Sequence, residues 1–101
     1  MERWDITIEA PMGAIAARLE LRRTEAGLEG RMTGKGGDGP MEEIAAEGDR
    51  LRWSCRITRP MPMVLKFDGR RDGDRMEGRV CFGVFAKGRF TAQRQGASEP
   101  V

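Results

Sequence analysis

The stretch WDITIEAPM, residues 4–12, decides the fold, because a second version of it, WSCRITRPM, occupies residues 53–61. Tryptophan, isoleucine, proline and methionine recur at an offset of 49 positions. In both copies apolar residues alternate with polar ones until the proline, which cannot donate a hydrogen bond to a β-ladder. The two stretches therefore predict two equivalent, half-buried β-strands.

The repetition continues beyond these strands. Residues 28–32, LEGRM, match residues 76–80, MEGRV, and the arginine pair at 22–23 matches the pair at 70–71. Both matches have an offset of 48, so one insertion or deletion separates them from the first block. We interpret the chain as an internal repeat, with copies at residues 4–47 and 53–94.

Each copy contains about four short apolar runs, separated by glycine-rich and proline-rich turns typical of an all-β chain. The 101 residues are enough for one domain. We predict an eight-stranded antiparallel up-and-down barrel built from two similar four-strand halves, over residues 1–94, with a flexible tail at 95–101. Closing the sheet would remove its edges. Two packed four-stranded sheets are the rival architecture, and 40–47 could be a short helix, although the repeat favours a strand.

Strand alternation assigns a set of large apolar side chains to the inner face. We expect these residues to line the barrel and to bind an apolar or amphipathic small molecule. The candidate residues are Trp4, Leu19, Met32, Trp53, Met63, Phe67, Met76, Phe82 and Phe90. The alternative is a protein–protein interaction module or homodimer, with a filled barrel and no ligand.

The composition argues against catalysis. Histidine and tyrosine are both absent, which removes the commonest general base and a common acid. Cys55 and Cys81 fall on opposite faces of their strands, so we expect reduced thiols without a histidine partner. We therefore expect a non-catalytic protein without a cofactor or a metal.

Three motifs favour ordinary structural interpretations. GKGGDG at residues 34–39 matches a dinucleotide-binding pattern but lacks the surrounding βαβ unit, so we interpret it as a hairpin loop. The acidic turn at 68–74 lacks the ligand spacing of a calcium loop. The methionines fall at inward positions, where they fill a core more often than they bind a soft metal.

The formal net charge of +2 is too small to indicate nucleic acid or a membrane as a partner. The start of the chain lacks the pattern of a secretion signal, so we expect a cytoplasmic protein.

Two arginine pairs occupy equivalent positions near turns in the two copies: Arg22 and Arg23, and Arg70 and Arg71. They could form an anion site at one end of the barrel, although solvated strand ends are the simpler interpretation.

Several motifs resemble a family of short bacterial domains. They include the run from Trp4 to Gly13, the run from Trp53 to Met63, and the D-G-D-x-M-x-G motif at residues 72–78. These domains resemble calycin-like barrels, and similar segments occur attached to bacterial enzymes such as amidohydrolases. The resemblance implies the barrel fold and carries no functional residues over.

Overall fold

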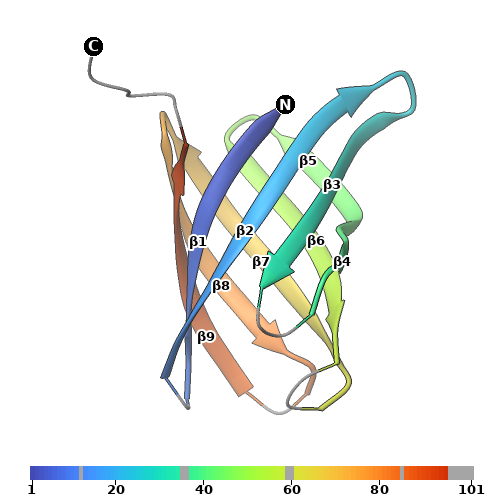
Figure 1. The fold of residues 1–101 in the computed structure, drawn as a ribbon. Coiled ribbons are helices and arrows are strands. Elements are labelled where there is room, and N and C mark those ends of the chain that lie inside the picture. The colour runs from blue at the N-terminus through green and yellow to red at the C-terminus, as the bar shows by residue number, and fades with distance from the viewer. Residues whose placement is uncertain (12, 35–36, 59–60, 85, 96–101) are drawn as a thin grey trace.

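The structure consists of antiparallel strands that follow one another around a barrel (Figure 1). It is a computed structural model that describes residues 1–11, 13–34, 37–58, 61–84 and 86–95. The strands are β1 (Glu2–Ala10), β2 (Gly13–Thr24), β3 (Gly27–Gly34), β4 (Gly39–Pro40), β5 (Glu42–Glu47), β6 (Arg50–Ile57), β7 (Met63–Asp72), β8 (Arg75–Phe82) and β9 (Ala86–Arg94). Within the described ranges there is no helix, and hence none that could cross a bilayer.

All the strands belong to one sheet, in the order β4-β3-β2-β1-β9-β8-β7-β6-β5. The two terminal strands of that order approach each other and nearly close the barrel. At this seam the Met41 backbone N–H donates a hydrogen bond to the Gly30 carbonyl at 2.8 Å. The predicted all-β antiparallel barrel is thus confirmed at the level of its architecture.

The predicted number of strands is wrong, because the structure has nine strands in one sheet rather than eight in two halves. The difference lies in residues 39–47, which form two strands with different partners. β4 pairs with β3, whereas β5 pairs with β6. Pro40 lacks an N–H, and the β5 register shifts between Glu42 and Ala45, where Glu43 has a φ of 52°. The proline and this bulge interrupt what would be one continuous strand. The residues are nonetheless extended, so the helical alternative for 40–47 is wrong.

Glycines on the inner face permit strong coiling of the sheet. A β-carbon on Gly78 would collide with the backbone carbonyl of Asp68, and one on Gly69 would lie 2.6 Å from Phe90 Cζ. Neighbouring strands therefore pass closer here than any larger residue would allow. The approach is also close at Gly30, where a β-carbon would lie 2.9 Å from the Glu20 backbone carbonyl on neighbouring β2.

The inner face holds one continuous hydrophobic core that draws on both ends of the chain. Leu19, Leu51 and Val80 have no exposed surface, and Trp4, Ile6 and Phe90 are 1% exposed. Of the predicted tail, only Gln95 is described, and its backbone N–H donates to the Arg3 carbonyl at 2.7 Å. Residues 96–101 lie outside the described part of the chain.

Candidate ligand-binding site

The nine residues predicted to bind a ligand in the barrel pack against one another. Eight are buried members of the core: Trp4, Leu19, Met32, Trp53, Phe67, Met76, Phe82 and Phe90. Met63 is partly buried and packs against that core. The structure thus brings the predicted set together as a core, and a role in ligand binding stays a prediction.

The centre of the barrel is occupied by three aromatic rings. Trp53 stacks on Phe67 with ring centroids 4.7 Å apart and planes inclined by 8°. Phe90 meets both rings edge-on, at centroid distances of 5.5 Å and 5.4 Å. These are favourable aromatic geometries. Space for a ligand must therefore be sought at the ends or on the outer face.

One end of the barrel carries an amphipathic hollow, which we call the mouth. The turns between β2 and β3, between β5 and β6 and between β7 and β8 gather at this end, with the start of β1 (upper end in Figure 1). The mouth has a volume of about 190 Å³. Its lining residues are Met1, Glu2, Leu21, Arg22, Arg23, Leu28, Leu51 and Arg71.

The floor of the mouth is apolar because it is the end of the core. Leu21 is 4% exposed and Leu51 has no exposed surface, and the half-buried Leu28 packs against them as part of the same cluster. Alternation along β2 and β3 directs Leu21 and Leu28 inward. An alkyl group placed in the mouth would therefore cover mainly the part of Leu28 that stays accessible.

The structure divides the two predicted arginine pairs by sheet face. Arg22 and Arg70 lie opposite Glu29 and Glu77 in the strand register, on the outer face. Arg23 and Arg71 lie opposite Leu28 and Met76, which belong to the inner face. One arginine of each pair is therefore directed towards the barrel interior at the same end.

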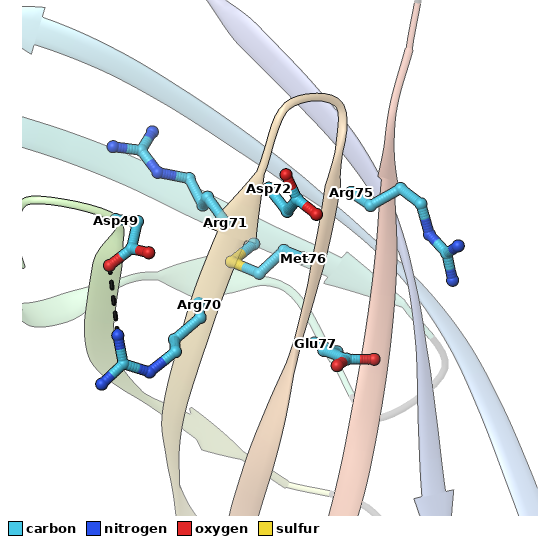
Figure 2. Close-up of a pocket in the computed structure, with 7 residues that line it drawn as sticks. All are labelled: Asp49, Arg70, Arg71, Asp72, Arg75, Met76 and Glu77. Atoms are coloured by element: carbon cyan, nitrogen blue, oxygen red, sulfur yellow. Dashed lines mark hydrogen bonds and ion pairs between the residues drawn. The ribbon is translucent and has the colours of Figure 1, made fainter.

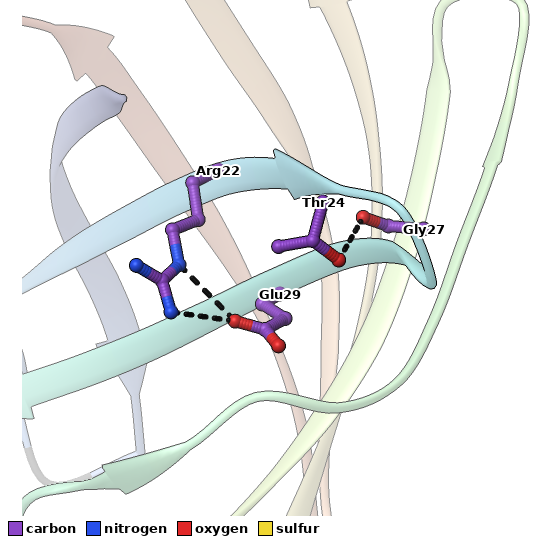
Figure 3. A network of polar contacts seen from close by, with 4 residues as sticks. All are labelled: Arg22, Thr24, Gly27 and Glu29. Atoms are coloured by element: carbon purple, nitrogen blue, oxygen red, sulfur yellow. Dashed lines mark hydrogen bonds and ion pairs between the residues drawn. The ribbon is translucent and has the colours of Figure 1, made fainter.

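Carboxylates hold the outer member of each pair. Arg22 donates from Nε and from a terminal nitrogen to the same Glu29 oxygen, at 3.1 Å and 2.9 Å, next to the turn that Thr24 closes on Gly27 (Figure 3). Arg70 donates to Asp49 on the β5–β6 turn at 3.2 Å (Figure 2). These two guanidinium groups already have anionic partners on the outer surface.

The inner arginines are much less engaged. Arg23 is exposed, and no carboxylate of the described residues lies within 4 Å of its guanidinium. Arg71 has Glu2 at 3.8 Å, beyond hydrogen-bond distance, and its side chain is 30% exposed. The same Glu2 oxygen accepts a hydrogen bond from the Trp4 indole at 3.2 Å. Two cationic groups are thus available above an apolar floor.

A second hollow, of about 370 Å³, adjoins the mouth through Arg71 (Figure 2). It combines three arginines, Arg70, Arg71 and Arg75, with three carboxylates, Asp49, Asp72 and Glu77. The three positive and three negative side chains balance in charge, and Met76 is the apolar residue of the lining. This hollow is a solvated strand end, which agrees with the simpler interpretation of the arginine pairs.

The remaining sequence motifs have structural roles where they are described. Gly34 ends β3 and Gly39 begins β4, which returns antiparallel to β3, so GKGGDG connects strands; residues 35–36 lie outside the described part. Asp68 pairs with Arg50, and Gly73 forms the β7–β8 turn with a φ of 64°. Among the described residues, no group of three or more acidic, cysteine or histidine residues could hold a metal.

The two cysteines are free, as predicted. Cys55 is 3% exposed on the inner face, and burial, with a smaller contribution from the charge of Glu42, raises the pKa of its thiol to about 11. Cys81 lies half-buried on the outer face, directly opposite Lys66 and Lys87 in the register. The different faces explain why the two thiols cannot form a disulfide.

Sequence reasoning missed the leucine floor and the separation of the arginine pairs. Alternation alone could have found the separation, because neighbouring residues on a strand face opposite sides. The meeting of Leu51 with Leu21 and Leu28 depends on the seam between β3 and β6. No local pattern in the sequence reports that contact.

Models of known protein families, characterised proteins and solved structures were each compared with this chain, and none matches it. The resemblance to calycin-like domains therefore stays a prediction.

Proposed function

We propose that this chain is a small non-catalytic barrel that binds a short amphipathic anion at its mouth. The observation that carries the proposal is the placement of Arg23 and Arg71 over the floor formed by Leu21, Leu28 and Leu51. The guanidinium groups would hold a carboxylate or phosphate head group, and the leucines would cover its alkyl chain. Guanidinium forms strong charge-assisted hydrogen bonds with both head groups.

The size of the mouth limits the ligand. Its volume of about 190 Å³ lies below the roughly 300–1,000 Å³ typical of sites for drug-sized molecules. It equals the volume of about six water molecules in the liquid. A short acyl chain fits this volume, whereas a long-chain lipid would extend into solvent.

The proposal is tested by calorimetric titration with hexanoate, hexanol and acetate. Hexanoate should bind more tightly than either, because hexanol lacks the charge and acetate lacks the alkyl chain. Arg71→Gln should weaken hexanoate binding about tenfold, as expected for the loss of a hydrogen bond to a charged group. Arg31→Gln is the matched control, since Arg31 is an exposed arginine of β3 that does not line the mouth.

Equal affinity for hexanoate and hexanol would overturn the proposal, because the arginines would then contribute nothing. The proposal would also be overturned if Arg71→Gln and Arg23→Gln had the same affinity for hexanoate as the unmodified chain. Unchanged unfolding curves would show that both variants are folded. The alternative of a protein-interaction module depends on a different surface, on the outer face of the barrel.

A further inference from the structure

Some lysine and arginine side chains of this chain lie within 4 Å of a carboxylate, and others do not. Sixteen lysines and arginines lie in the described residues, and eight of them have a carboxylate within 4 Å. Of the eight without one, Arg23, Arg31 and Arg75 are scattered. The other five occupy one surface, which we call the basic face: Arg52, Lys66, Arg79, Lys87 and Arg89.

The strand register places these five side chains together. Arg52 of β6 lies in a row with Asp68, Arg79 and Arg89 across β7, β8 and β9. Lys66 and Lys87 flank Cys81 in the adjacent row. All five cationic residues are exposed, and all point outward, away from the core.

The basic face is hollowed. A depression of about 510 Å³ is lined by four of the cations, with Glu43, Ser54, Asp68 and Cys81. A neighbouring depression of about 660 Å³ shares Asp68 and Arg79 with it and extends to Arg89 and Glu9. The Arg50 guanidinium holds the pKa of Asp68 below its usual value, with smaller contributions from the charges of Arg52 and Arg70.

We infer that the basic face docks an acidic segment of a partner protein. Five cations with no carboxylate of the described residues within 4 Å supply the charge complementarity that favours and orients such a contact. Asp68, Glu77 and Glu9 are interspersed among the cations. A protein segment can place its own cations or hydrogen-bond donors beside these carboxylates, whereas the continuous phosphates of a nucleic acid would be repelled by them.

Among the described side chains of this face, no exposed aromatic ring is available for a nucleic-acid base to stack on. Trp4, Trp53, Phe67, Phe82 and Phe90 are all buried, so none of them offers an exposed ring. Proteins that bind single-stranded nucleic acid without sequence preference use exposed aromatic rings for stacking. The acidic protein segment is therefore the better-supported occupant.

The inference is tested by fluorescence anisotropy with a labelled ten-residue peptide of alternating glutamate and serine. A peptide of alternating glutamine and serine and a twelve-nucleotide single-stranded DNA serve as comparison probes. The glutamate peptide should bind best, and its affinity should fall as salt is raised, since exposed charges are screened. Arg79→Gln should weaken binding about fivefold, the upper end for an exposed ion pair.

Arg31→Gln is the matched control, because it removes the same charge from an arginine of β3 that also has no carboxylate within 4 Å in the described part of the chain. It should change the affinity less than about twofold, within the scatter for a charge away from the contact. Equal weakening by Arg31→Gln and Arg79→Gln would overturn the inference, because only net charge would then matter. Tighter binding of the DNA than of the glutamate peptide would overturn it as well.

Discussion

The indole nitrogen of Trp53 lies 3.4 Å from the sulfur of Met32, to which it donates a hydrogen bond inside the core. Trp53 is on β6 and Met32 is on β3, and the two strands are not paired with each other. The contact crosses the seam at which the sheet fails to close by strand pairing. Together with the Met41–Gly30 backbone hydrogen bond, it joins the two sides of the barrel.

Removing the sulfur at the seam should destabilise the barrel more than an equivalent change elsewhere. Met32→Leu leaves the buried Trp53 N–H without an acceptor, whereas Met76→Leu, also in the core, removes no hydrogen bond of the described residues. The volume-conserving swap itself costs less than about 1.5 kcal/mol. We expect Met32→Leu to cost about 1 kcal/mol more than Met76→Leu, because a thioether is a weak acceptor. Urea unfolding of both variants measures this difference, and equal values would show that the seam contact contributes nothing.

The coiling of the sheet makes Gly78 intolerant of a side chain. Gly78→Ala would drive a β-carbon into the Asp68 carbonyl, which belongs to the backbone and cannot rotate away. We expect a loss of about 1–3 kcal/mol or more in the free energy of unfolding, as for other overpacked sites. Gly39→Ala is the comparison, since its β-carbon would meet nothing closer than the Arg56 carbonyl at 3.9 Å. A Gly78→Ala variant as stable as Gly39→Ala would contradict the close strand approach.

The Arg50–Asp68 pair predicts part of the acid sensitivity of the fold. Arg50 donates two hydrogen bonds to Asp68, at 3.0 Å and 2.7 Å, and these lower the pKa of the carboxyl group in the folded state. A carboxyl whose pKa is lower when folded stabilises the fold above its unfolded value of about 3.9. This stability is lost as the pH falls through the folded pKa.

The two variants Asp68→Asn and Arg50→Gln should therefore be less stable than the unmodified chain at pH 6, with a difference that shrinks below about pH 4. Both side chains are more than a third exposed, so the effect should be small. Chemical unfolding across this pH range measures it. A difference that stayed constant with pH would argue against the pair as its source.

The two thiols should react with very different rates. Cys81 is half-buried on the outer face, whereas Cys55 is buried and its pKa is raised to about 11, so little of it is thiolate near neutral pH. In the folded chain, an aromatic disulfide reagent should label one thiol rapidly, and Cys81→Ser should abolish that fast phase. Cys55 should react only after unfolding. Rapid labelling of two thiols in the folded state would contradict the burial of Cys55.

Much of the fold could be predicted from the sequence because alternation is a local signal. Alternation alone predicts that Trp4, Phe67 and Phe90 face the core, and all three are buried there. The division of residues 39–47 could not be predicted, since it depends on how β3 and β6 approach each other. The repeat predicts one strand there, whereas Pro40 and the bulge at Glu43 divide the segment into two strands.

The candidate site was predictable only in part. The sequence predicts all four arginines near the turns as candidates for an anion site. In the structure Glu29 pairs with Arg22 and Asp49 pairs with Arg70, which leaves Arg23 and Arg71 for a bound anion. The basic face could be located only from the strand register, because its five cations come from four consecutive strands and the pairing decides which of them share a row. Ion pairing between side chains is equally invisible to composition, which gives a net charge of only +2.

The most direct test of the proposed function is a two-dimensional amide NMR titration of the full chain with hexanoate. The account predicts saturable shifts at Leu21–Leu28, Leu51 and Arg71, and a shift of the Trp4 indole proton as the anion displaces Glu2 from Arg71. The amides of β1 and β2 at the opposite end of the barrel should not respond. Shifts confined to that opposite end, or none at a saturating concentration of hexanoate, would contradict an amphipathic anion site at the mouth.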